Sequence, residues 1–336
     1  MSNSDVRSDE GDRRPQASSI DRISASLRTG MWLPVGVVIL LFAFFSIATP
    51  SFFSLRNATG ILGQASTLLL ACLGSSFVVL MGSIDLSVGA MVLLVGSATV
   101  IALNFADLGV FALVFAIIFG TGLGAINGTI FSFGRIPSFV VTLGTLSVFT
   151  GAAWQLLEGR ALRFDSTVFE SLAIAQLIPK VPNIALFALV AWAIMAWVGA
   201  KTRFGRYMYA IGGGEAVART AGLPVRRYQI YAFALSGAMA GLAGALATAR
   251  LGAAGPTLGQ DLLLNTLAAI VVGGTSLAGG VGGVHRTLVG VLIIALLDNG
   301  LNLMGVNQYT QMVVKGAVVI LAVLISQDRG KHFIIK

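Results

Sequence analysis

The residue types that commonly perform catalysis or bind metals are scarce in this chain of 336 residues, which holds two histidines and one cysteine. His285 and His332 have no further ligands beside them at metal-binding spacing. Cys72 stands alone in an apolar run, so we expect neither an intramolecular disulfide nor a metal cluster. The phosphate-binding pattern GxxxxGKS or GxxxxGKT is absent, since Gly330-Lys331 is followed by histidine. We therefore expect no catalytic residue, no metal and no nucleotide on this chain itself.

Three charged residues lie inside long apolar stretches, where a charge is costly. Asp85, in the segment MGSIDLSVGA, either caps a helix beginning at Leu86 by accepting backbone N–H groups or lines a transport path. Asp298 and Lys315 flank the turn Gly305–Asn307 at similar separations, which places both roughly 12–14 Å below it at helical rise. Because the two residues would lie at equal depth on neighbouring antiparallel helices, we predict that they form a structural ion pair, which lowers the energetic cost of each buried charge.

Neutral amides occur in the same apolar stretches. Such groups can exchange hydrogen bonds with a hydroxyl-rich solute without presenting a fixed charge, but they can equally join neighbouring helices. The candidates for a translocation path are Asp85, Asn127, Asn265, Asn299 and Asn302, with Gln311 as a further amide.

The composition indicates a membrane protein. Hydrophobic residues make up 56% of the chain and charged residues 11%, whereas soluble domains average about 25% charged residues. Apolar stretches of about 20 residues recur from residue 31 onward, which predicts an all-α polytopic membrane protein. The net charge of +8 is concentrated in one loop and in a tail containing Arg329, Lys331 and Lys336. That distribution indicates membrane topology and contact with anionic lipid rather than nucleic-acid binding.

The elements that must position the polar residues are about ten transmembrane helices. Hydropathy places them near 31–49, 58–81, 86–105, 109–133, 138–157, 183–200, 229–250, 262–276, 286–304 and 308–326. An even number of crossings puts both termini and every basic cluster on the cytoplasmic side. We therefore divide the chain into a disordered cytoplasmic N-terminal tail (1–30), a transmembrane domain (31–326) and a cytoplasmic C-terminal tail (327–336). The segments Gly82–Ser87 and Gly273–Gly283 are candidates for breaks in the helices.

One short loop between apolar stretches is strongly basic. Lys201–Arg227 carries six basic residues against one acid, Glu215, which marks it as cytoplasmic. Within it we expect a short helix over Glu215–Ala221, preceded by three glycines and followed by Gly222 and Pro224. A helix in that position is well placed to contact a soluble partner.

Two patterns suggest internal symmetry and close packing. Ala125–Leu143 resembles Leu297–Lys315, with Asn127-Gly128 matching Asn299-Gly300, in hairpins that would turn on opposite sides. Either the chain contains two inverted halves of five helices, or apolar sequences match here by chance. Small residues also recur every four positions and flatten one face of a helix. Such a face allows either one helix to slide past another during transport or two helices to pack closely without moving. The small residues are Gly120, Gly124 and Gly128, and Gly237, Gly241 and Ala245.

Several long motifs resemble, in order, those of the permease subunits of monosaccharide ABC importers of the ribose and xylose type. They are GSIDLSVGA, TRFGRYMYAIGGGEAVARTAGLPV, LSGAMAGLAGALATARL, LAAIVVGGTSLAGGVGG and LDNGLNLMGVNQYTQMVVKGAVVILAVL, within roughly residues 55–326. The resemblance implies that the loop at 201–227 couples the chain to a cytoplasmic ATPase. It assigns this role to Gly212, Gly213, Glu215, Ala216, Arg219 and Gly222. Leu263 and Asn265 replace an acid pair usual in ribose-type members, and Gly214 stands where asparagine is common.

The resemblance also implies the partners and the location. A bacterial inner-membrane permease of this kind works with a second permease copy, as a homodimer or with a related permease, and receives sugar from a periplasmic binding protein. ATP and Mg would be bound by the partner ATPase. The replaced acid pair leaves open a nucleoside or a furanose-like signalling molecule as the solute. An ion-coupled secondary carrier and a membrane-embedded enzyme are further alternatives, although neither an ion site nor a nucleophile–base spacing supports them.

Overall fold

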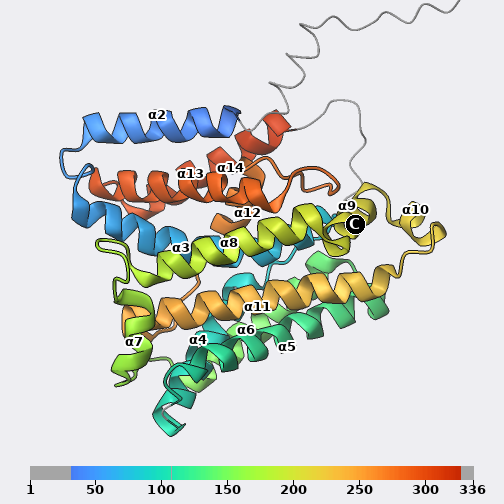
Figure 1. Cartoon of the computed structure of the whole chain (residues 1–336), viewed down its shortest axis with the longest axis horizontal. Helices are drawn as coiled ribbons and strands as arrows, with labels where there is room; N and C mark the ends of the chain where they lie inside the picture. Colours follow the sequence, from blue (N-terminus) through green and yellow to red (C-terminus); the bar gives the residue numbers. More distant parts are fainter. Residues whose placement is uncertain (1–31, 107, 327–336) are drawn as a thin grey trace, which may run out of the picture.

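The computed structural model describes residues 32–106 and 108–326, and the predicted tails at 1–30 and 327–336 lie outside these ranges. Within them the regular secondary structure is almost wholly helical (Figure 1). Two short strands, β1 (Leu162–Arg163) and β2 (Ala253–Ala254), pair antiparallel with Leu162 opposite Ala254. The helices are α2 (Trp32–Ala48), α3 (Leu55–Leu80), α4 (Val88–Ala106), α5 (Phe111–Gly134), α6 (Ser138–Leu157), α7 (Thr167–Ile174), α8 (Asn183–Lys201), α9 (Arg203–Gly213), α10 (Glu215–Thr220), α11 (Val225–Leu251), α12 (Leu262–Val272), α13 (Val284–Leu303) and α14 (Gln308–Ser326).

Each of the ten predicted spans contains one of these helices. Of the helices described, seven are long and apolar enough to cross a membrane: α3, α4, α5, α6, α8, α11 and α13. The apolar helices α2 and α12 are shorter, with 17 and 11 residues. At 1.5 Å per residue α12 covers only about half of a hydrocarbon core. The chain is therefore an all-α polytopic membrane protein, whereas ten crossings and cytoplasmic termini remain predictions.

Non-helical backbone interrupts the bundle at both predicted breaks. Between α3 and α4, Gly82 adopts φ +78°, and α4 begins at Val88 rather than at the predicted Leu86. Glycine reaches this left-handed region without the steric cost that a side chain brings. Between α12 and α13 several glycines also have left-handed φ values: Gly274, Gly279, Gly280 and Gly282.

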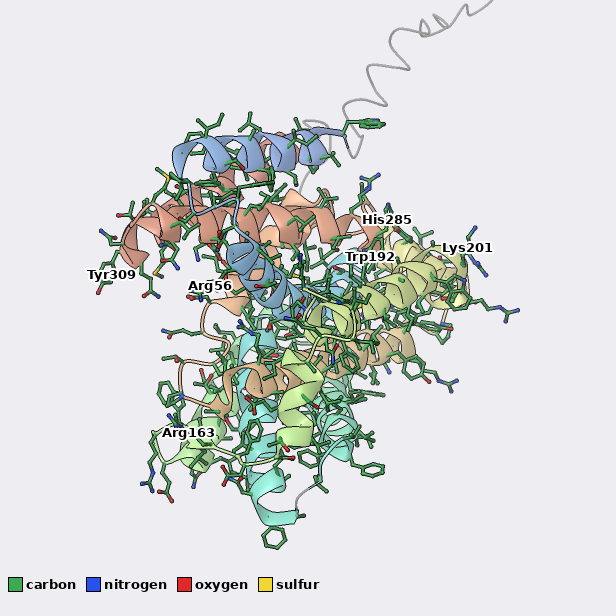
Figure 2. All side chains as sticks on the ribbon, turned by 60° about the vertical axis from the view of Figure 1, so that its left-hand side comes forward. Arg56, Arg163, Trp192, Lys201, His285 and Tyr309 are labelled. Carbon is green, nitrogen blue, oxygen red and sulfur yellow. The ribbon has the colours of Figure 1, made fainter. Side chains whose placement is uncertain are left out.

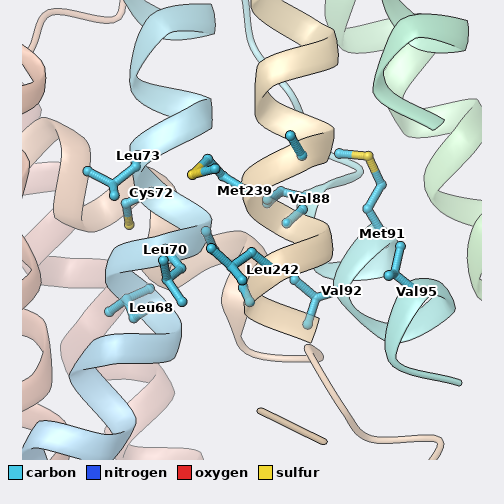
Figure 3. Close-up of a cluster of buried hydrophobic side chains, with 14 of the residues drawn as sticks. Leu68, Leu70, Cys72, Leu73, Val88, Met91, Val92, Val95, Met239 and Leu242 are labelled. Atoms are coloured by element: carbon cyan, nitrogen blue, oxygen red, sulfur yellow. The ribbon is translucent and has the colours of Figure 1, made fainter. Parts of the chain in front are cut away.

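Helix α11 runs through the middle of the bundle, with α5, α3 and α4 packed against it (Figure 1). Figure 3 shows buried apolar side chains of α3, α4 and α11 gathered between these three helices. A seam of glycines joins α11 to α5, where a Cβ on Gly124 would lie 2.1 Å from the carbonyl oxygen of Phe233. A Cβ on Gly237 would lie 2.1 Å from the carbonyl oxygen of Gly120. The two predicted rows of small residues therefore face each other and let the backbones touch.

The short helices α9 and α10 lie together at one end of the bundle, called the α9–α10 end below (Figure 1). Helix α5 ends and α11 begins there, since the Arg226 guanidinium lies 5.4 Å from the centroid of the Phe133 ring. Helix α13 begins at the same end, where the Tyr209 hydroxyl donates to the carbonyl of Gly282 at 2.8 Å. The α5–α6 turn and the α13–α14 turn therefore lie at opposite ends, as an inverted repeat requires. The five-plus-five repeat itself remains a prediction.

Candidate functional site

The basic segment 201–227 contains the two short helices α9 and α10, between the end of α8 and the start of α11. Helix α9 is amphipathic, because it buries Met208 and Ile211 while Arg203 and Arg206 are exposed. Its apolar face fastens it to the bundle, and its basic face points outward. Figure 2 shows Lys201, the last residue of α8, beside this helix at the periphery of the molecule.

Helix α10 projects beyond the bundle (Figure 1). Glu215 opens it and forms an ion pair with Arg219 one turn later, at 2.6 Å. Ala218 faces inward and is 4% exposed, while Val217 is 72% exposed. The turn after the helix contains Gly222 at φ +80°, which only glycine adopts without strain. The helix thus presents an apolar and a charged side chain away from the rest of the chain.

The structure gathers the residues expected to couple to an ATPase in one short stretch. Gly212 is packed against backbone of two other segments, whereas no atom lies within 4 Å of where a Cβ on Gly213 would stand. A shallow hollow of about 300 Å³ adjoins α10 and is lined by Arg219 and by 223–227, with three arginines and no acid. The full set lies on the last turn of α9, on α10 and directly after it: Gly212, Gly213, Glu215, Ala216, Arg219 and Gly222.

Asp85 is the centre of a buried network of hydrogen bonds and is 2% exposed. Its Oδ1 accepts from the backbone N–H of Ser87 at 3.0 Å and from the Ser87 hydroxyl at 2.7 Å. The Ser236 hydroxyl donates to its Oδ2 at 2.9 Å and lies 3.3 Å from that of Ser75. Asn127 donates to the Ser87 hydroxyl oxygen at 2.8 Å and is fully buried. The network joins the start of α4 to α3, α5 and α11, and within this single chain it exposes neither Asp85 nor Asn127.

Asp298, in the last third of α13, meets Lys315, near the middle of α14. Lys315 Nζ lies 3.1 Å from Asp298 Oδ1, and the two side chains are 9% and 25% exposed. Asn265 of α12 donates its amide to Asp298 Oδ2 at 3.2 Å. Asn265, which the sequence predicts to line the path, therefore donates a hydrogen bond to the carboxylate of the ion pair. The three residues join α12, α13 and α14.

The two remaining path candidates are one turn apart on α13 but lie in different surroundings. Asn299 and Asn57 exchange two amide hydrogen bonds, at 2.9 and 2.8 Å, which join α13 to α3. Asn57 also donates to the carbonyl of Phe52 at 2.9 Å. Asn302 is exposed, so of the five candidates it is the one most accessible to solute in the isolated chain.

Sequence reasoning overlooked Asn57 and the three serines, 75, 87 and 236, that complete these networks. A single serine or asparagine in an apolar stretch carries no local sign of its partner, because the partner lies on another helix. For Ser87 alone a signal existed, since it follows Asp85 by two residues, the spacing at which an aspartate accepts from the backbone in a turn.

The polar clusters provide hydrogen-bonding groups, but in each of them the carboxylate, where there is one, has no second described carboxylate bonded to the same partners. Within 32–106 and 108–326, no three His, Cys, Asp or Glu side chains lie close enough together to hold a metal ion. His285 is exposed near the α9–α10 end, where the Trp192 indole N–H donates to its backbone carbonyl at 3.3 Å and joins α8 to α13 (Figure 2). Burial raises the pKa of Tyr209 above its ordinary value, with Arg286 offsetting part of the rise, so its hydroxyl stays a donor at neutral pH.

Comparisons with known proteins match this amino-acid sequence to permeases. Residues 57–323 match the family model described as "Branched-chain amino acid transport system / permease component". The ribose import permease protein of Haemophilus influenzae is 36% identical over 87% of this chain and 92% of its own length. The ribose import permease protein of Bacillus subtilis is 38% identical over 85% and 89%, and the D-allose transport system permease protein of Escherichia coli is 34% identical over 87% and 90%. No solved structure matches the chain. The chain therefore belongs to this family of ABC transporter permease components and is a multi-pass protein of the inner membrane.

Proposed function

We propose that this chain is the membrane-spanning subunit of an ATP-driven importer that moves a monosaccharide delivered by a periplasmic binding protein. The observation that carries the proposal is the nearly full-length similarity to import permeases named for ribose and allose, at 34–38% identity. Most of the buried polar side chains described within the bundle are hydroxyls and amides, which suit a neutral solute rich in hydroxyl groups.

The α9–α10 end is the docking point for the cytoplasmic ATPase in this proposal. Helix α10 presents Val217 and Arg219 outward, and the hollow beside it is basic, which suits a partner surface with an apolar pocket and acidic residues. ATP and Mg would bind to the partner alone. Nucleotide binding there would displace α10, and the spans of two permease copies would reorient around the solute.

The five path candidates divide into two groups under this proposal. Asp85 and Asn127 hold the start of α4 in place beside the path, because both are buried and bonded to serines. Asn265, Asn299 and Asn302 lie on α12 and α13, where Asn302 is exposed. We propose that these amides border the solute route between the two copies.

Removing the ion pair on α10 tests the docking proposal. The double variant Glu215→Ala, Arg219→Ala should insert into the membrane normally but lose ATP-dependent uptake, because α10 is six residues long and loses the ion pair that joins its first turn to its last. The control is Glu158→Ala, Arg160→Ala, which removes an exposed ion pair beyond the far end of α6. Uptake in both variants should be measured in cells that contain the partner ATPase and binding protein. Undiminished uptake in the α10 variant would contradict the assignment.

The solute class needs a separate test, because Leu263 and Asn265 stand where ribose-type relatives usually carry acids. Mass spectrometry of the partner binding protein, purified with its native ligand, should find a monosaccharide. A nucleoside or a furanose-like signalling molecule in that protein would support the nearest alternative. Uptake that survives loss of the ATPase would instead indicate an ion-coupled carrier.

A further inference from the structure

We propose that Gly212 is the residue through which α9 and α10 transmit force to both breaks in the helix bundle. This inference rests on the proposed function, since it concerns how movement of α10 would reach the spans. At this point three backbone segments meet without a side chain between them: the last turn of α9, the end of α3 with Gly82, and the loop 273–283.

The contacts at Gly212 are backbone to backbone. A Cβ on Gly212 would lie 2.0 Å from the carbonyl oxygen of Leu80 and 2.4 Å from the amide nitrogen of Gly280. Gly280 donates that N–H to the same Leu80 carbonyl at 2.9 Å. A Cβ on Gly279 would lie 2.6 Å from the nitrogen of Gly82 and 3.0 Å from the Cα of Gly212. All three segments are therefore in direct contact, and a displacement of one cannot be absorbed by a flexible side chain.

A second bond fastens α9 to the same loop. The Tyr209 hydroxyl donates to the carbonyl of Gly282 at 2.8 Å, three residues before Gly212 on the helix. Within the loop, Gly283 donates its N–H to the Thr275 hydroxyl at 3.2 Å, which braces the loop across its base. Helix α9 thus holds the loop at two points, and the loop moves with it as a unit.

Each segment that touches Gly212 leads to a polar cluster. The end of α3 continues through Gly82 to Asp85, whose bond to Ser236 ties the start of α4 to α11. The loop 273–283 joins α12 to α13, which carry Asn265 and Asp298. A displacement of α9 at Gly212 would therefore be transmitted to both groups of residues that we place beside the solute route.

Two glycines within helices provide a matched pair of variants. Gly212→Ala must push the three segments apart by more than about 1 Å, because a carbon approaches an oxygen to about 3.3 Å, whereas the Cβ would stand 2.0 Å from the Leu80 oxygen. Gly122→Ala, on α5 and outside the coupling residues, adds the same methyl group where no atom lies within 4 Å. Neither glycine has a φ in the left-handed region, so strain at the substituted residue is not a factor.

The readout is a spin label on Ala278→Cys, in the loop and exposed, in the full chain assembled with its ATPase. The native Cys72 is 0% exposed and does not compete for the label. In the parent and in Gly122→Ala we expect the label mobility to change when MgATP is added. In Gly212→Ala we expect that change, and ATP-dependent uptake of radiolabelled D-ribose or D-allose, to fall by roughly two- to thirtyfold, the range of measured coupling losses.

The outcomes separate the two proposals. Failure of the parent chain to co-purify with the ATPase would refute the proposed function. Normal co-purification with equal label responses in Gly212→Ala and Gly122→Ala, or no response in the parent, would overturn the role of Gly212 alone. If Gly212→Ala does not accumulate, Tyr209→Phe decides, because it removes one hydroxyl and adds no atom. We expect Tyr209→Phe to weaken the label response, and an unchanged response would overturn the proposal.

Discussion

Replacing Lys315 should destabilise the chain far more than replacing Lys315 and Asp298 together. Lys315 Nζ lies 3.1 Å from Asp298 Oδ1, and the lysine side chain is 9% exposed. At an effective dielectric constant of about 20, two unit charges at this distance attract by roughly 5 kcal/mol, before the cost of removing them from water. That cost offsets most of the attraction, so the pair as a whole contributes little net stability.

The single and double variants separate these terms. Lys315→Met keeps most of the side-chain volume but leaves the Asp298 carboxylate with the Asn265 amide as its described donor, which should cost roughly 3–5 kcal/mol. Adding Asp298→Asn removes the stranded charge and leaves an amide that can still accept from Asn265. The double variant should therefore lie within about 1 kcal/mol of the parent, since neutral replacement of a buried pair is often close to neutral in energy.

The assay is equilibrium or thermal unfolding of the full purified chain in detergent, followed by fluorescence of its four tryptophans. Lys201→Met is the control, because it removes an exposed lysine from the last turn of α8. It should change the unfolding free energy by less than about 1 kcal/mol. Equal destabilisation in Lys315→Met and in the double variant would refute the reasoning, since it would show that the two charges do not interact.

Two further predictions concern contacts between helices. Gly124→Ala should destabilise the full chain by about 1–3 kcal/mol, because its Cβ would lie 2.1 Å from the Phe233 carbonyl oxygen. Gly122→Ala, with no atom within 4 Å, should be neutral or stabilising by up to about 1 kcal/mol, and equal thermal midpoints for the two variants would contradict the seam. Asn299→Leu should cost about 1–3 kcal/mol by leaving the Asn57 amide short of a partner. Adding Asn57→Leu should restore part of that stability in the same unfolding assay, and further loss would count against the pairing.

Much of the helical architecture could be predicted from local sequence. All ten predicted spans contain helices, because about 20 consecutive apolar residues report burial in lipid whatever they pack against. Both breaks fall at glycines for a similarly local reason, since Gly82 and Gly274 adopt backbone conformations that other residues avoid. The short helix within 201–227 was also expected, although it ends at Thr220 rather than at Ala221.

The partners of the polar residues could not be predicted in the same way, with one exception. Asp298 and Lys315 meet across a single turn, so their depth could be counted along the chain. The bond of Asp85 to Ser236 spans 151 positions, and no spacing rule connects them. Whether two such groups meet depends on how each helix is rotated about its axis and which helix lies beside it.

The sequence by itself determined the membrane class, the helical segments, the basic loop and the presence of small residues on two helix faces. Only the tertiary structure decided that those faces meet, that Asn299 bonds to Asn57, and that Gly212 touches both interrupted segments. Hydropathy and backbone preference depend on a few neighbouring residues, so they can be recognised from the local amino-acid composition. Contacts between helices are set by the packing of the whole bundle, in which any apolar face can be buried against several others, and they are fixed only when all the helices are in place.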